Sequence, residues 1–256
     1  MNQLIAIILA LIALVINVII ISHTAYKNKK LTCDRYVLNS YLYVSLAILI
    51  INLMIVVNSG TNVMESMIPM LYGSLVGVII QLLIIFALFF YFATLDPTKD
   101  KVLIHSVWVL IMVLLGIMLY PLVLLNKANS NLGMVLLVSL SLVILSGVLG
   151  NKYGDVIVQF DWDKYLYTAL IFLVVLSLGL QYSGTLNSSN YIYITWAILI
   201  VFILLLIAYN KKLVENSKTC LEHNNPNYLK ESLGLFTKIM NVFASVSRLM
   251  GRRRRF

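Results

Sequence analysis

The sequence predicts an all-α integral membrane protein, and three observations support that prediction. Of its 256 residues, 61% are hydrophobic and only 11% are charged, whereas soluble domains are about 25% charged. The apolar residues are gathered in runs of about 20, the length of a helix that crosses a bilayer. Short polar stretches with turn formers, such as Asp96-Pro97 and Ser183-Gly184, separate the runs.

The first apolar run covers residues 3–22 and predicts a membrane anchor. The residues before it carry no basic side chain, and three lysines follow it by residue 30. A cleaved signal peptide has the opposite arrangement, with its basic residues before the apolar run. We therefore predict an uncleaved anchor with its amino end outside. Together with the basic loop that follows, this anchor forms a first segment, residues 1–35.

Six further apolar runs predict a six-span membrane bundle over residues 36–209. Each run is long enough to cross, or nearly cross, the hydrocarbon core as a helix. With the anchor they give seven strong transmembrane spans. The six runs are residues 37–57, 71–92, 103–125, 132–149, 166–182 and 191–209.

None of the seven predicted spans contains Asp, Glu, Lys or Arg. A charge buried in the membrane costs about 2.5 to 3.5 kcal/mol on insertion scales and is kept where transport or proton relay needs it. We therefore expect neither a pump nor a coupled transporter nor an enzyme, and no cofactor. The acidic loop with Asp155, Asp161 and Asp163 lacks the glycine turn and distal glutamate of a calcium loop, so we predict no metal site either.

The distribution of Lys and Arg predicts the orientation. With the carboxyl tail inside, 18 of the 19 basic residues fall in inner segments and only Lys127 falls outside. This bias predicts an outer or lumenal amino end and a cytoplasmic carboxyl end. Cys33 and Cys220 then lie on the inner, reducing side, and their spacing fits no metal site or disulfide framework. We interpret them as separate thiols.

The remaining segment, residues 210–256, predicts a linker, an amphipathic helix and a basic tail. Helical spacing over residues 228–250 places large apolar residues on one side and polar residues on the other. Asn225 or Asn227 is a candidate cap for this helix. It either lies on the inner leaflet or dips among the spans. A complete crossing would carry the tail outside, so we favour a re-entrant or interfacial placement. The apolar side holds Leu229, Leu233, Phe236, Met240, Phe243 and Met250.

The basic tail is formed by Arg252, Arg253, Arg254 and Arg255. On the inner face of a membrane it would attract anionic lipid, at about 1 kcal/mol for each basic group near the surface. It could also bind other membrane or virion proteins. We expect no nucleic acid as a partner.

The stretch from residue 207 to residue 250 resembles the carboxyl end of the Bax-inhibitor family. In that family a last span and a short polar run precede a half-apolar helix, as they do here. The resemblance implies a bundle of six spans with a semi-polar seventh helix, so the anchor at residues 3–22 would be an addition. The agreement runs through Leu213, Glu215, Asn216, Lys218, Cys220, Pro226, Tyr228, Lys230, Glu231, Ser232, Leu233, Leu235, Ile239, Asn241 and Phe243.

The same resemblance identifies three candidate gate positions. The family carries two aspartates whose proton-sensitive contact is credited with gating calcium leak. The first falls on Tyr209 without a gap, or on Asn210 if one residue is dropped, and the second falls on Lys238. Both aspartates are therefore missing in this sequence.

The resemblance implies a non-enzymatic protein of internal, endoplasmic-reticulum-like membranes that is linked to calcium leak and restraint of cell death. Without the aspartates, we predict little or no proton-gated leak. The alternative is a structural role. The tail sequence looks most similar to forms carried by large icosahedral DNA viruses, so the chain could be a component of a virion inner membrane that binds other virion components.

Overall fold

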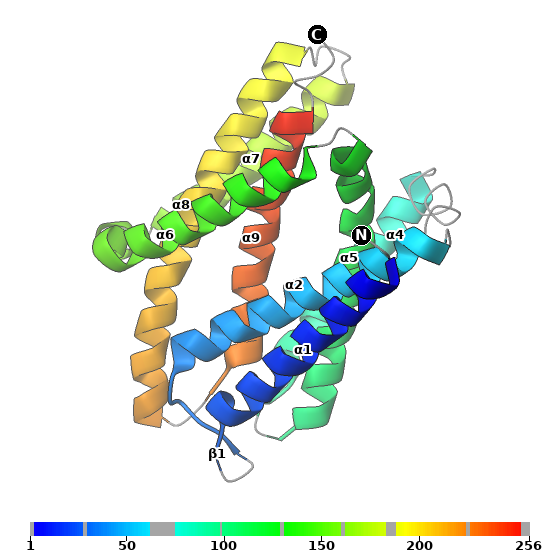
Figure 1. Cartoon of the computed structure of the whole chain (residues 1–256). Coiled ribbons are helices and arrows are strands. Elements are labelled where there is room, and N and C mark those ends of the chain that lie inside the picture. The colour runs from blue at the N-terminus through cyan, green and yellow to red at the C-terminus, as the bar shows by residue number, and fades with distance from the viewer. Residues whose placement is uncertain are drawn as a thin grey trace. The chain divides into compact units, whose positions relative to one another are not determined.

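The computed structural model describes residues 3–27, 30–61, 75–97, 99–128, 131–159, 162–182, 188–223 and 226–251. These residues form eight α-helices and one pair of two-residue strands, so the predicted all-α class is confirmed. Strand β1 (Tyr26–Lys27) pairs antiparallel with β2 (Lys30–Leu31). The helices are α1 (Gln3–Ala25), α2 (Tyr36–Thr61), α4 (Leu75–Thr94), α5 (Lys101–Ala128), α6 (Leu132–Gln159), α7 (Trp162–Tyr182), α8 (Ser188–His223) and α9 (Tyr228–Gly251) (Figure 1).

Five of these helices are long and apolar enough to cross a membrane, namely α1, α2, α5, α6 and α8. Helices α4 and α7 contain shorter apolar stretches, Ile79–Thr94 and Lys164–Ser177. Each of the seven predicted spans thus coincides with a helix, and five of them reach the full length in the described residues. Many large apolar side chains on α1, α4, α6 and α7 are exposed to the surroundings. This surface suits lipid, and the chain is an integral membrane protein.

The helices form two compact units. Unit 1 comprises Met1–Pro121 and Ser217–Leu233, and unit 2 comprises Leu122–Asn216 and Gly234–Phe256. Helices α5, α8 and α9 each contribute residues to both units.

In unit 1 the added anchor, α1, packs along α2, and the two helices lie side by side (Figure 1). Halfway along them, the side-chain amide of Asn17 donates a hydrogen bond of 3.0 Å to the Ser45 hydroxyl. Asn17 is only 7% exposed. A hydrogen bond between helices holds them together in lipid, where water offers no alternative partner. Helix α1 is therefore a packed member of its unit as well as an anchor.

An aromatic cluster joins α2, α5 and the start of α9 in unit 1. The Tyr43 ring lies 5.8 Å from the Trp108 ring and 6.4 Å from the Tyr228 ring, between centroids. The buried Trp108 indole donates a hydrogen bond of 3.2 Å to the Ser232 hydroxyl. A buried indole N–H needs an acceptor, and this bond links the beginning of α9 to α5.

His105 lies at the edge of this cluster, and its polar contacts among the described residues are with Lys101, Tyr26 and Tyr43. Its Nδ1 is 2.6 Å from the Lys101 carbonyl oxygen, which can only accept, so Nδ1 carries the hydrogen. Its Nε2 then accepts from the Tyr43 hydroxyl at 3.0 Å. No group of three or more possible metal ligands occurs among the residues that the structure describes.

The two cysteines are bonded to each other, so their interpretation as separate thiols is wrong. Cys33 and Cys220 form a disulfide with a Cα–Cα distance of 5.6 Å. It joins the segment after β2 to the last turn of α8, across 187 residues of sequence. Sequence spacing at that range says nothing about distance in space, and only the fold of unit 1 brings the two segments together.

Helix α9 has the amphipathic character and the extent that the sequence predicts. It begins at Tyr228, and the Glu231 amide donates to the carbonyl of the preceding Asn227 at 3.1 Å. Of the two candidate caps, Asn227 therefore stands at the start of the helix, and Asn225 lies outside the described residues. Leu229, Leu233, Phe236 and Phe243 are buried, whereas Asn241 and Arg248 are exposed.

Unit 2 brings α6, α7 and α8 together with most of α9. Leu166 of α7 packs with Val201 and Leu205 of α8 in a buried cluster. At the far end of α9, the Met250 carbonyl accepts a hydrogen bond of 3.2 Å from the Asn131 side chain, just before α6. The end of α9 is thus fixed to the segment before α6 in unit 2, and the re-entrant or interfacial placement of this helix in the membrane stays a prediction.

Candidate functional site

The predicted gate positions Tyr209 and Lys238 meet between α8 and α9. The Lys238 ammonium nitrogen lies 4.0 Å from the centroid of the Tyr209 ring. It also donates a hydrogen bond of 3.3 Å to the Gly234 carbonyl, one turn earlier in α9. We call this contact the Tyr209–Lys238 pair.

Gly234 allows the pair to form. A Cβ atom at this position would collide with the phenol group of Tyr209, so the ring lies directly on the backbone of α9. The aromatic face is thereby held below the ammonium group. A cation over an aromatic face contributes about 0.5 to 1 kcal/mol at exposed sites and about 2 when it is desolvated.

Asn210 faces a different helix. Its Cβ lies 2.8 Å from where a Cβ at Gly150 of α6 would be, and Asn210 is only 6% exposed. Neighbouring residues of a helix point about 100° apart, so one of the two can face α9 while the other faces α6. Of the two alternatives from the sequence, Tyr209 is therefore the residue that contacts Lys238.

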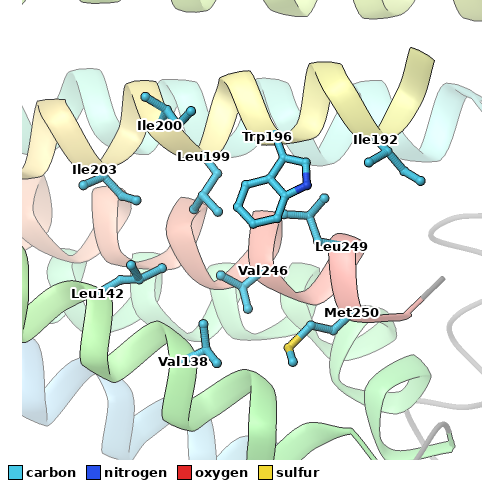
Figure 2. A pocket seen from close by; sticks show the side chains of 10 residues that line it. All are labelled: Val138, Leu142, Ile192, Trp196, Leu199, Ile200, Ile203, Val246, Leu249 and Met250. Atoms are coloured by element: carbon cyan, nitrogen blue, oxygen red, sulfur yellow. The ribbon is translucent and has the colours of Figure 1, made fainter. Parts of the chain in front are cut away.

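The helices around the pair also enclose an apolar pocket that the sequence did not reveal. It has a volume of about 430 Å³ and lies between α6, α8 and α9. Figure 2 shows Trp196 and Leu199 of α8 beside Val246 and Leu249 of α9, with Leu142 of α6 on the other wall. These residues belong to three different helices, and in the sequence none of them differs from the other apolar residues of its helix. We call this space the apolar pocket.

The apolar pocket and the Tyr209–Lys238 pair together give the direction of α9 relative to α8. Tyr209 of α8 contacts Lys238 of α9, whereas Ile192 of α8 lines the same pocket as Met250. The residue numbers fall along one helix as they rise along the other, so α8 and α9 are antiparallel in unit 2. The contact extends from the Tyr209–Lys238 pair to the first turn of α8.

A family model described as an inhibitor of apoptosis-promoting Bax1 matches residues 33–255. The chain belongs to the Bax inhibitor family. The match includes the Tyr209–Lys238 pair and begins after α1, so the added anchor lies outside it. No curated protein and no solved structure matches the chain.

Other residues singled out in this Bax inhibitor family protein lie outside the described part of the chain. These are the four arginines of the tail, residues 252–255, and Asp161 of the acidic loop. The predicted lipid or partner contacts of the tail remain predictions.

In this Bax inhibitor family protein, Tyr209→Leu and Lys238→Met are expected to show energetic coupling. Each single variant loses the whole cation–π contact, and the double variant cannot lose it again. The free energy of unfolding should therefore fall by about 0.5 to 2 kcal/mol less in the double variant than the two single losses add up to. Unfolding of the four proteins in detergent measures this coupling. Tyr209→Phe serves as the control that keeps the ring. Strict additivity of the two single changes would show that the pair contributes no stability.

Proposed function

We propose that this chain is a non-enzymatic Bax inhibitor family protein of an internal membrane that modulates ion leak or cell death, and that it has lost proton-gated calcium leak. One observation carries the proposal. Where the resemblance implies two carboxylates, the chain has a lysine ammonium 4.0 Å above a tyrosine ring. Neither residue supplies a carboxylate that could exchange a proton or bind calcium.

The charge of Lys238 supports the loss of cation passage. At roughly 7 Å and an effective dielectric constant of about 20, an ammonium group repels a divalent cation by about 5 kcal/mol. The hydrogen bond to Gly234 and the ring of Tyr209 hold this charge between α8 and α9. A calcium ion that followed the contact between these helices would therefore meet a fixed positive charge.

Calcium flux into liposomes that contain the purified protein tests the proposal. At both neutral and acidic pH, the native protein should leak no faster than empty liposomes. The variant with Tyr209→Asp and Lys238→Asp should leak, because it places two carboxylates where the ring and the ammonium now meet. Its matched control carries Asn210→Asp and Lys238→Asp, and it should remain silent because Asn210 faces α6.

Two results of this assay would overturn the proposal. One is a native leak that changes with pH through a carboxylate-like midpoint. The other is a native leak above that of empty liposomes at both pH values, since Lys238 would then not block cations.

A structural role in a virion inner membrane is the second candidate, and α1 is the observation that favours it. This helix lies outside the family match and exposes a row of large apolar side chains, Leu4, Leu11 and Val15 among them. In addition to lipid, such a surface can contact another membrane helix. If the native protein is silent in the flux assay and the Tyr209→Asp, Lys238→Asp variant leaks, the fold is intact without its ion function, as a structural or partner-binding role requires.

A further inference from the structure

We propose that a second pocket in unit 2, between α7, α8 and α9, binds one anionic phospholipid. Its headgroup phosphate would pair with Arg248, and an acyl chain would lie along α7 and α8. The pocket has a volume of about 470 Å³. We call it the amphipathic pocket. The inference is independent of any ion function.

Three of the five polar residues that line the amphipathic pocket gather at one end. Ser177 belongs to the last two turns of α7, Tyr191 to the first turn of α8, and Arg248 to the last turn of α9. Consecutive antiparallel helices place the end of α7 level with the start of α8, and the antiparallel contact of α8 and α9 places the end of α9 there as well. A guanidinium and two hydroxyl groups thus share one level.

The opposite end of the pocket is lined by apolar residues of α7 and α8 and by Asn241 of α9. Val174 of α7 and Ile198 and Phe202 of α8 line it. From Tyr191 to Phe202 the helix rises about 16 Å, which is about half of the 30 Å hydrocarbon core. The pocket therefore has the polarity and the depth of one lipid leaflet, with its polar end beside the start of a candidate span.

Arg248 determines which headgroup the pocket prefers. It is exposed, and no acid accompanies it among the described lining residues. A guanidinium group can bind phosphate through two parallel hydrogen bonds, and it is more weakly hydrated than an ammonium group. An uncompensated arginine at the headgroup level selects a lipid with a net negative charge over a zwitterionic one.

The apolar pocket of Figure 2 supplies the contrast. It borders the other side of the same α8–α9 contact, but its lining is apolar apart from the Trp196 indole N–H. Nothing in it selects a headgroup. The two pockets have similar volumes, but only the amphipathic pocket should prefer a lipid with a negatively charged headgroup.

Native mass spectrometry of the full-length protein tests the proposal. The protein is taken from bilayers with equal amounts of phosphatidylglycerol and phosphatidylcholine, and the retained lipid is counted. We expect one phosphatidylglycerol for each chain. Arg248→Gln should lower the preference for phosphatidylglycerol about tenfold, as the loss of one charge-assisted hydrogen-bonding group implies. Ala244→Phe, which fills the pocket from α9, should remove the retained lipid whatever its headgroup.

Two control variants separate the pocket from other sources of lipid binding. Changing all four tail arginines to glutamine should leave the retained lipid in place, and so should Val138→Phe, which fills the apolar pocket instead. The proposal is overturned if the tail variant loses the lipid while Arg248→Gln keeps it. It is equally overturned if both headgroups are retained alike, or if no lipid is retained. Arg248 is exposed, so its variant tests the pocket even if Ala244→Phe fails to fold.

Discussion

Reduction of the Cys33–Cys220 disulfide is expected to lower the unfolding temperature of the purified protein by roughly 5 to 15 °C, corresponding to about 2 to 4 kcal/mol. The bond closes a loop of 187 residues. A loop of this size would give about 5 kcal/mol if the unfolded chain were free in solution. Membrane helices stay inserted after unfolding and already confine the chain, so we expect a smaller gain.

Thermal unfolding in detergent, with and without a thiol reductant, measures this effect. The variant with both Cys33→Ser and Cys220→Ser is the matched control, and it should unfold at the lower temperature in both conditions. If the native protein ignores the reductant, the disulfide contributes nothing to stability. If both thiols of the unreduced, unfolded protein react with an alkylating reagent, the bond has not formed.

The predicted orientation gives this experiment a second use. Cytoplasmic thiols are kept reduced, and disulfides persist in oxidising compartments. The Lys and Arg count places both cysteines on the cytoplasmic side, where the bond would be open. Alkylation of Cys33 and Cys220 in intact cells, before lysis, therefore reports whether unit 1 has this stabilising bond in its own membrane.

Gly150→Ala is expected to destabilise the protein by about 1 to 3 kcal/mol, the usual penalty for overpacking a close contact. A Cβ at this position would lie 2.8 Å from the Ile207 carbonyl oxygen and 2.8 Å from the Cβ of Asn210. The carbonyl belongs to the backbone of α8 and cannot rotate away as a flexible side chain could. Helices α6 and α8 would have to separate.

Gly133→Ala, in the same helix, is the matched control. A Cβ there meets nothing within 4 Å. Alanine favours a helix by up to about 1 kcal/mol relative to glycine, so this variant should be unchanged or slightly more stable. Equal stability of the Gly150 and Gly133 variants, measured by unfolding in detergent, would show that α6 and α8 do not approach closely at Gly150.

The helices of this protein could be predicted from the sequence because their signal is local. A run of about 20 apolar residues, or a stripe of large apolar residues at helical spacing, is visible in a single segment, so the seven predicted spans and α9 coincide with helices. The resemblance also selected Tyr209, Asn210 and Lys238. It did not show that Tyr209 faces α9 while Asn210 faces α6, because that choice depends on how α8 is rotated against its neighbours.

The features that could not be predicted all combine distant segments. Cys33 and Cys220 are 187 residues apart, and the sequence around neither cysteine indicates which residue it is bonded to. The amphipathic pocket takes its residues from three helices, and in sequence Arg248 reads as one polar residue among several on the exposed side of α9. Such sites depend on helix packing, which a hydrophobic pattern specifies only in part.

Unit 1 is built from two segments that are far apart in the chain, so it cannot assemble in one step during synthesis. Helices α1 and α2 are joined by a short hairpin and can pair as soon as both have entered the membrane, since such local contacts form early. The same unit also needs Ser217–Leu233, which is synthesised after helices α1 to α7. Because Cys220 lies in this later segment, the disulfide can close only after α1 to α7 and most of α8 have been made.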